Sequence, residues 1–186
     1  AEPRAYLMAL SFPEAPTRDW MQRFAAGLAE AQAAFGLHLI GGDTDRRPGP
    51  VSITITVFGE VPPDVALLRQ SAEPGDDIYV SGQPGEARMA LEVFRGKLSL
   101  SEPDFEHCRL RMEQPTPRVT LGLALRGVAH AAIDVSDGLF GDLGHILQRS
   151  GVGAQIETRW LEGSPATSEV LLSLPWNRRL DMALAG

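Results

Sequence analysis

The stretch AIDVSDGL, residues 132–139, places two aspartates three positions apart where an apolar segment passes into a helical pattern. The apolar run at residues 129–135 predicts a buried strand, and the apolar residues of LFGDLGHIL, residues 139–147, have helical spacing. Carboxylates at the end of a strand can bind hard cations such as Mg²⁺, with substrate phosphates completing the coordination. Asp134 and Asp137 are therefore candidate magnesium ligands.

The same residues also fit the ordinary start of a helix. Ser136 or Asp137 could act as an N-cap that accepts a hydrogen bond from a free backbone N–H, and Asp142 would add favourable negative charge in the first turn. A second acidic element elsewhere in the chain is needed to distinguish a metal site from a helix cap.

The sequence GGDT, residues 41–44, is such an element. It lies between a short predicted strand at residues 37–40 and an alternating, β-branched strand at residues 51–61, so we expect it in an acidic loop. The two glycines would let a ligand approach the backbone closely, and Asp43 supplies a hard oxygen. A tight turn with solvated charges explains the same residues without a ligand.

Hydrophobic periodicity predicts strands and helices along the rest of the chain. Thr17 is a candidate N-cap and Gly36 a candidate stop for the first helix. Residues 97–114 form either an irregular connection or a loose helix. Further strands are expected at residues 5–12 and 76–82, and a turn followed by a short strand is expected within residues 150–157. Helices are expected at residues 16–36, 84–96, 115–128, 139–149, 168–174 and 177–185.

A cluster of prolines and glycines marks the best candidate for a domain boundary. We expect an N-terminal domain over residues 1–62, a connector over residues 63–75 and a C-terminal domain over residues 76–186. Arg69, within the connector, could contact a phosphate or nucleotide, although a surface ion pair is the more frequent fate of a lone arginine.

The composition is typical of a folded globular chain, with 44% hydrophobic and 22% charged residues among 186. The net charge of -7 and the scattered basic residues argue against a nucleic-acid surface. A single cysteine, Cys108, excludes an internal disulfide and shows no metal-ligand spacing. Without a secretion signal or a long apolar span, we expect no membrane partner and a cytoplasmic location.

Four motifs occur in one order along the chain. They are GGDT at residues 41–44, LLRQSAEPGDDIYVSG at residues 67–82, PTPRVTLGLALRG at residues 115–127 and AIDVSDGLFGDLGHIL at residues 132–147. In this order and spacing the chain resembles the thiamine-monophosphate kinase family, within the superfamily of aminoimidazole ribonucleotide synthetase. DVSDGL followed by DLGHIL is specific to this family, whereas GGDT is shared more widely in the superfamily.

The resemblance implies an enzyme that transfers the γ-phosphoryl group of ATP to thiamine monophosphate, with Mg²⁺ as cofactor. It implies an α/β (α+β) fold of two domains: the second half of an N-terminal βαββ domain, whose sheet pairs in a homodimer, followed by most of a C-terminal α/β domain. ATP would bind between them. Direct phosphoryl transfer needs positioned oxygens and cations rather than a protein nucleophile, so no catalytic side chain is assigned.

The resemblance also implies which residues bind the ligands. The magnesium ligands would be Asp43, Asp134 and Asp137. The ATP contacts would be Gly42, Asp43, Arg69 and Ser136. The chain spells LLRQSAEPGD where the family usually has RSGAKPGD, and it has additional residues after GGDT, so Arg69 departs most from the family pattern.

The family also has acidic motifs before the first strand found here and a GGEDYELLF-like segment after the last helix. Neither is present in these 186 residues. We therefore expect a fragment that lacks part of the metal site and most of the thiamine pocket, and that is inactive or poorly active alone. Two alternatives stay open: another ATP-dependent synthetase of the superfamily, and a noncatalytic remnant that dimerises through its strands.

Overall fold

The computed structural model describes residues 1–164 and 167–185. Its internal contacts divide the chain into two compact units. The first contains Ala1–Ala66 and Val119–Arg126, and the second contains Leu67–Arg118 and the residues from Gly127 onward. The chain combines a sheet with several helices, which confirms the expected mixed α/β class. The connector at residues 63–75 stays a prediction.

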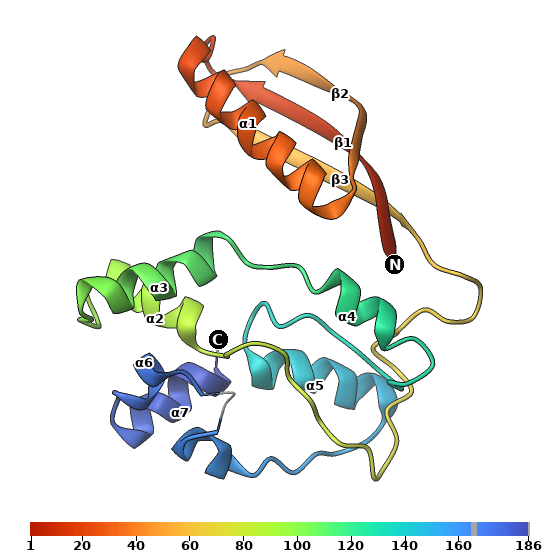
Figure 1. Cartoon of the computed structure of the whole chain (residues 1–186), viewed down its shortest axis with the longest axis vertical. Helices are drawn as coiled ribbons and strands as arrows, with labels where there is room; N and C mark the ends of the chain where they lie inside the picture. The colour runs from red at the N-terminus through yellow and green to blue at the C-terminus, as the bar shows by residue number, and fades with distance from the viewer. Residues whose placement is uncertain (165–166, 186) are drawn as a thin grey trace. The chain divides into compact units, whose positions relative to one another are not determined.

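The first unit is a three-stranded sheet with one long helix (Figure 1). Its elements are β1 (Glu2–Phe12), α1 (Arg18–Phe35), β2 (His38–Arg46) and β3 (Ser52–Glu60), and the short helix α4 (Val119–Ala124) also belongs to it. β1 is the central strand, parallel to β2 and antiparallel to β3. The βαββ arrangement expected at this end of the chain is present.

Helix α1 begins and ends where the local sequence predicts. The Thr17 side chain accepts a hydrogen bond from the N–H of Trp20 at 3.2 Å, and Gly36 ends the helix with a φ of 63°. The Trp20 ring stacks on Phe24 at a centroid distance of 5.0 Å and meets Phe12 of β1 edge-on at 5.5 Å. These aromatic contacts fix α1 against one face of the sheet.

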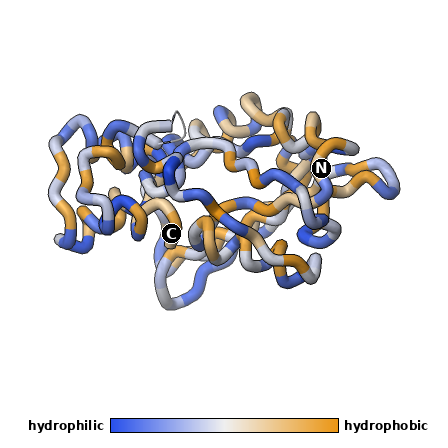
Figure 2. Tube along the Cα trace, turned by 90° about the horizontal axis from the view of Figure 1, so that it is seen from below, coloured by the Kyte–Doolittle hydropathy of each residue, from blue (hydrophilic) through white to orange (hydrophobic). Residues whose placement is uncertain are grey.

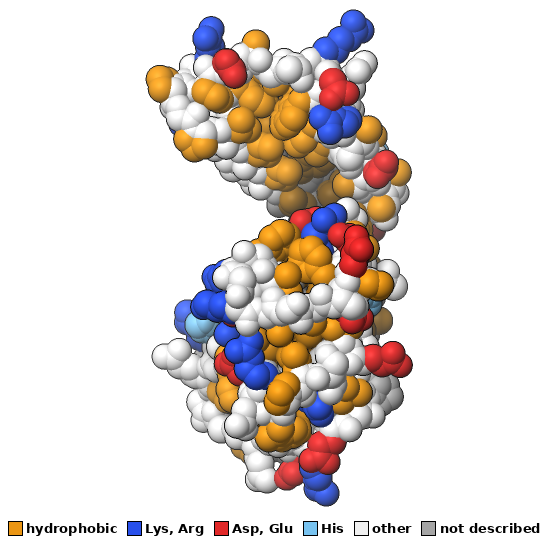
Figure 3. Space-filling view, turned by 90° about the vertical axis from the view of Figure 1, so that its left-hand side faces the viewer, with side chains coloured by type: hydrophobic (Ala, Val, Ile, Leu, Met, Phe, Trp, Pro, Cys, Tyr) orange, Lys and Arg blue, Asp and Glu red, His pale blue; other side chains and the backbone are white. Residues whose placement is uncertain are grey.

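Strand β3 is an edge strand that leaves apolar side chains exposed. Ile53, Ile55, Val57 and Phe58 are between 42% and 54% exposed. Successive residues of a strand point to opposite faces, so β3 presents apolar surface on both sides of the sheet. Hydrophobic side chains are visible over this unit in Figure 3.

The GGDT motif lies within β2, and the acidic loop expected at this position is wrong. Gly42 pairs with Met8 of β1 beyond a register shift between Tyr6 and Leu7. A β-carbon at Gly42 would lie 1.8 Å from the carbonyl oxygen of Met8, so this position requires glycine. The strand continues through the two glycines past this irregularity in the ladder, and at Gly42 β1 approaches too closely for a side chain.

The second unit is built from helices, most of which contribute to one hydrophobic core (Figure 1). Its elements are α2 (Glu86–Phe94), α3 (Glu102–Glu113), α5 (Leu139–Ser150), the 3-10 helix η1 (Thr158–Glu162), α6 (Glu169–Leu172) and α7 (Trp176–Leu184). The core includes Met89, Cys108, Leu161, Leu171 and Met182, each from a different element. Residues 97–114, which could have been irregular, contain α3.

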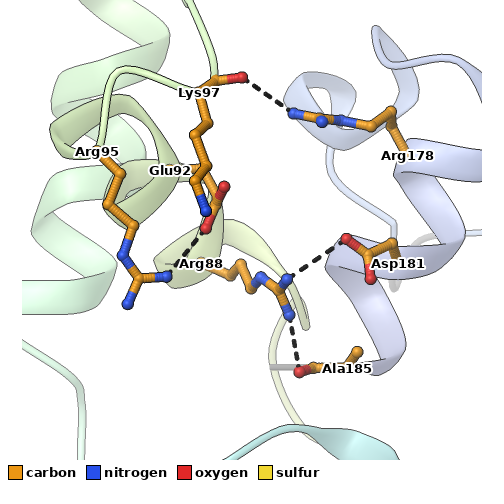
Figure 4. Close-up of polar contacts among 7 residues, drawn as sticks. All are labelled: Arg88, Glu92, Arg95, Lys97, Arg178, Asp181 and Ala185. Atoms are coloured by element: carbon orange, nitrogen blue, oxygen red, sulfur yellow. Dashed lines mark hydrogen bonds and ion pairs between the residues drawn. The ribbon is translucent and has the colours of Figure 1, made fainter.

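Polar contacts attach α7 to α2 and to the turn that follows α2 (Figure 4). The Arg88 guanidinium donates to the carbonyl oxygen of Ala185 at 2.8 Å and lies 3.4 Å from the carboxylate of Asp181. Arg178 donates to the carbonyl oxygen of Lys97 at 3.2 Å. These contacts use backbone carbonyls near helix ends as acceptors, and they orient α7 while Met182 fills the core.

The strands expected at residues 76–82, 129–135 and 150–157 are absent from the described part of the second unit, so these predictions are wrong. An apolar stretch becomes a strand only where a neighbouring segment completes a hydrogen-bonded ladder. Ala132 donates its N–H to the carbonyl of Leu68 at 2.9 Å, but the described residues form no ladder there. Apolarity alone did not indicate whether a pairing partner was present.

No helix among the described residues is long and apolar enough to cross a membrane. Hydrophobic and hydrophilic positions are interspersed along the whole trace in Figure 2.

Candidate functional site

The loop that carries Asp134, Ser136 and Asp137 leads directly into α5. This helix begins at Leu139 with Gly138 as its N-cap, and no side chain caps it. Gly138 has a φ of 118°, a conformation that strongly favours glycine. The alternative in which Ser136 or Asp137 acts as the N-cap is therefore wrong. Asp134 is 80% exposed and accessible to a ligand.

Asp142, in the first turn of α5, holds the backbone of this loop. Its Oδ2 accepts hydrogen bonds from the N–H of Ser136 at 2.8 Å and from the N–H of Asp137 at 3.0 Å. Asp142 is 4% exposed. Because this carboxylate already accepts from both amides, a phosphate at the loop would not use these two N–H groups.

Arg69 and Asp134 are two predicted site residues that the structure brings together. The Arg69 guanidinium lies 4.0 Å from the Asp134 carboxylate, and both side chains are more than half exposed. Exposed ion pairs contribute about 1 kcal/mol or less to stability. Either partner can therefore exchange the other for a ligand at small cost.

The segment that carries Arg69 is attached to other parts of the second unit at three further points. These join Leu68 to Ala132, Ala72 to Ser150 and Asp76 to His130. The first two are hydrogen bonds of 2.9 and 3.1 Å, and the third is an ion pair of 2.9 Å. Arg69 is thus held beside the loop by contacts other than its own.

Gly42 and Asp43 lie on β2 in the first unit, whereas the other predicted site residues belong to the second unit. Asp43 is exposed, and its Oδ1 accepts a hydrogen bond from the N–H of Thr44 at 2.8 Å. Arg46, also on β2, donates to the carbonyl oxygen of Pro13 at 3.3 Å.

The chemistry of the loop suits a hard cation. Asp134 and Asp137 offer carboxylate oxygens and Ser136 a hydroxyl, whereas soft metals prefer thiolates. Within residues 1–164 and 167–185, no three acidic, histidine or cysteine side chains are placed together as a complete metal site. The loop fits Mg²⁺ as part of a coordination shell that water and phosphate oxygens complete.

Asp142 is the residue whose role sequence reasoning missed. The sequence indicated only that it would add charge to the first turn of the helix. Asp142 follows the N-cap Gly138 by four residues and bonds the two residues before that cap, so the contact is not a capping box, and no local sequence signal identifies it.

Models of two domains match the chain. The model described as AIR synthase related protein, N-terminal domain, matches residues 1–61, and the model for the C-terminal domain of the same family matches residues 73–182. Together they extend over most of the chain, in the order that the motifs indicated.

Individual relatives agree with this assignment. The chain is 38% identical over 187 aligned residues to a thiamine-monophosphate kinase of Salmonella typhimurium, covering 100% of the chain and 56% of the relative. The crystal structure of thiamine-monophosphate kinase from Stenotrophomonas maltophilia K279a superposes with a TM-score of 0.88 at 43% identity, covering 100% of the chain and 58% of that structure.

A second solved structure contains ligands. It is described as AaThiL complexed with AMPPCP and TMP, and it matches with a TM-score of 0.74 at 25% identity, covering 99% of this chain and 58% of that one. The chain therefore spans a little over half the length of these relatives. The resemblance read from the motifs is confirmed, and the chain belongs to the AIR synthase related protein family.

Proposed function

We propose that the complete protein containing this chain transfers the γ-phosphoryl group of ATP to thiamine monophosphate and releases ADP and thiamine diphosphate. The observation that carries the proposal is the 38% identity over the whole chain to a named thiamine-monophosphate kinase. The related structure described with AMPPCP, an ATP analogue, and TMP supports the same pair of substrates.

The proposed magnesium ligands are Asp43, Asp134 and Asp137, and the proposed ATP contacts are Gly42, Asp43, Arg69 and Ser136. Bound Mg²⁺ would neutralise charge on the phosphates. Since Asp142 occupies the backbone N–H of Ser136, we expect Ser136 to contact ATP through its hydroxyl. Arg69 would exchange its exposed pair with Asp134 for a phosphate oxygen, leaving that carboxylate to the cation.

In the proposed reaction, a phosphate oxygen of thiamine monophosphate attacks the γ-phosphorus of ATP. The bond from this phosphorus to the oxygen that bridges the β- and γ-phosphates breaks, and that oxygen leaves with ADP. The protein contributes by positioning donor and acceptor oxygens and by offsetting their charge. No side chain forms a covalent intermediate.

The proposal extends to the assembly and location of the protein. The apolar side chains exposed on β3 support a homodimer through the sheet of the first unit, because removing apolar surface from water is favourable. We also propose a cytoplasmic protein with domains over residues 1–62 and 76–186. The 186-residue chain alone is expected to be inactive or poorly active.

The test measures thiamine diphosphate formation by the complete reading frame that contains these residues and by the 186-residue chain. Asp134→Asn and Asp137→Asn should each lower turnover by about 100-fold or more, since even indirect changes around metal ligands cost about 10–100-fold. Asp19→Asn, an exposed aspartate paired with Arg23 on α1, is the matched control and should retain activity.

The outcomes separate the competing functions. A complete protein that forms no thiamine diphosphate contradicts the proposal. If it then consumes ATP with an amide or formyl acceptor, the synthetase alternative is correct. If instead it consumes no ATP and gives no heat with Mg²⁺ and AMPPCP in titration calorimetry, the noncatalytic alternative is correct.

A further inference from the structure

We infer that Asp142 is a positioning residue that sets the spacing of the proposed metal ligands Asp134 and Asp137. This inference rests on the proposed function, because it concerns the same loop. It assigns a role to a side chain that lies outside the proposed ligand and ATP-contact sets.

The two hydrogen bonds of Asp142 fall between the proposed ligands. They fix the peptide that joins Val135 to Ser136 and the peptide that joins Ser136 to Asp137. Peptide units are planar and nearly rigid, so two fixed planes leave few backbone rotations between the α-carbons of the aspartates. The carboxylates on either side are then held near one relative position.

Burial makes this anchor stiff. Asp142 is 4% exposed and Gly138, the helix N-cap, is also buried. A buried carboxylate is costly unless it is hydrogen bonded, and both bonds found here go to the loop rather than to the first amides of its own helix. If the loop moved away from α5, the buried carboxylate would lose both hydrogen bonds. The loop and α5 are therefore expected to move together.

The role of Asp142 differs from that of a ligand. Its Oδ2 already accepts two N–H groups, whereas Asp134 is largely exposed and can turn toward a cation. Groups that orient metal ligands by hydrogen bonding typically change metal affinity by about 10–100-fold when they are removed. Loss of Asp142 should therefore weaken metal binding without removing a ligand.

The experiment measures Mn²⁺ affinity by electron paramagnetic resonance, in the presence of AMPPCP, on the complete protein that contains this chain. Asp142→Ala should weaken Mn²⁺ binding by about tenfold or more. Asp142→Asn keeps an oxygen acceptor in the same place, so the loss should not exceed about threefold, as for one weakened hydrogen bond. Glu92→Ala removes a buried acid paired with Arg95 on α2, and its Mn²⁺ affinity should equal that of the wild type.

Two results from the variants would overturn the inference: Mn²⁺ affinity of Asp142→Ala equal to that of Glu92→Ala, or equal losses in Asp142→Asn and Asp142→Ala. The second result would mean that charge rather than position matters. Wild-type protein that binds no Mn²⁺ also overturns it. Hydrogen exchange of the wild type needs no variant, and rapid exchange of the Ser136 and Asp137 amides would show that the anchor does not hold.

The failure of this inference and that of the proposed function give different results. Wild-type protein that forms thiamine diphosphate, with unchanged Mn²⁺ affinity in Asp142→Ala, overturns the positioning role alone. Wild-type protein that forms no thiamine diphosphate contradicts the kinase function, whatever the Mn²⁺ affinities of the variants are.

Discussion

The imidazole Nδ1 of His130 lies 2.9 Å from one carboxylate oxygen of Asp76 and 3.0 Å from the other. The hydrogen bond to Asp76 raises the pKa of His130 above its ordinary value of about 6.5, and the nearby charges of Asp76 and Glu73 act in the same direction. The hydrogen bond that Asp76 accepts from the backbone N–H of Glu73 has the largest effect and lowers the pKa of Asp76 below its ordinary value of about 3.9. The hydrogen bond with His130 lowers this pKa as well.

The His130–Asp76 pair should make the stability of the second unit depend on pH. The imidazole contribution is complete below pH about 6.5 and is lost as the pH rises through its higher folded pKa. The carboxylate contribution is present above pH about 3.9 and is lost as the pH falls through its lower folded pKa. The pair is therefore worth most between these two pH values.

Urea denaturation of the wild type and His130→Gln, followed by tryptophan fluorescence, measures this effect. The difference in unfolding free energy should be largest from pH about 4 to about 6.5 and should shrink toward pH 9. His38→Gln, which changes an exposed histidine at the start of β2, is the control. A His130→Gln difference that stays constant across this range would show that the ion pair does not act as described.

The first unit was largely predictable because its signals are local. Thr17, Gly36 and the aromatic spacing of α1 each act within a few residues, so the sequence predicted this helix correctly. The GGDT loop was wrong for the opposite reason. The need for glycine at Gly42 comes from Met8, a residue of another strand that only the folded sheet brings close.

The candidate site shows the same division between local and distant information. Motif spacing identified Asp134 and Asp137 as candidate ligands, but it could not show that Arg69 lies beside Asp134, because the two are far apart in the chain. The strand expected at residues 129–135 failed because a ladder depends on a second segment. Whether the candidate residues bind ATP and Mg²⁺ stays a prediction.

The exposed apolar edge strand predicts the effect of a charge on assembly. Val57 is 54% exposed on β3, and Val57→Lys would bury an ammonium group in the proposed dimer interface. We expect a dimer for the wild type and a monomer for Val57→Lys when mass is measured by light scattering. Gln22→Lys, on the exposed surface of α1, adds the same charge and should leave the dimer intact. A wild-type monomer, or a dimeric Val57→Lys, would contradict the proposed interface.

The single thiol should be unreactive in the folded chain. Cys108 is fully buried. Burial is the main cause that raises the pKa of its thiol to about 11, and the negative charges of Glu86 and Asp104 add to it. Since the thiolate is the reactive form, a disulfide reagent at pH 8 should label no native thiol and one thiol per chain in guanidinium. Ser99→Cys places a thiol at an exposed position and should add one fast-reacting group. Fast labelling of the native wild type would mean that this part of the core opens readily.

The carboxylate of Glu86 connects α2 to α3 and should contribute to stability only while both of its partners are present. Its side chain is 2% exposed; one oxygen lies 2.8 Å from Nε2 of His107 and the other 3.3 Å from Nε of Arg111.

Removing both partners in His107→Ala/Arg111→Ala leaves a buried charge uncompensated, which should lower the unfolding free energy by about 3 kcal/mol. Adding Glu86→Gln removes that charge and should restore more than half of the loss, because a neutral amide is less costly to bury. Arg109→Ala removes a half-buried arginine of the same helix that pairs with Glu106 and Glu113 rather than with Glu86, and should change stability by about 1 kcal/mol or less. Chemical denaturation of the wild type, the double variant, the triple variant and Arg109→Ala measures these differences. A triple variant as unstable as the double variant would contradict the prediction, because the loss would then come from packing on α3 rather than from the buried charge.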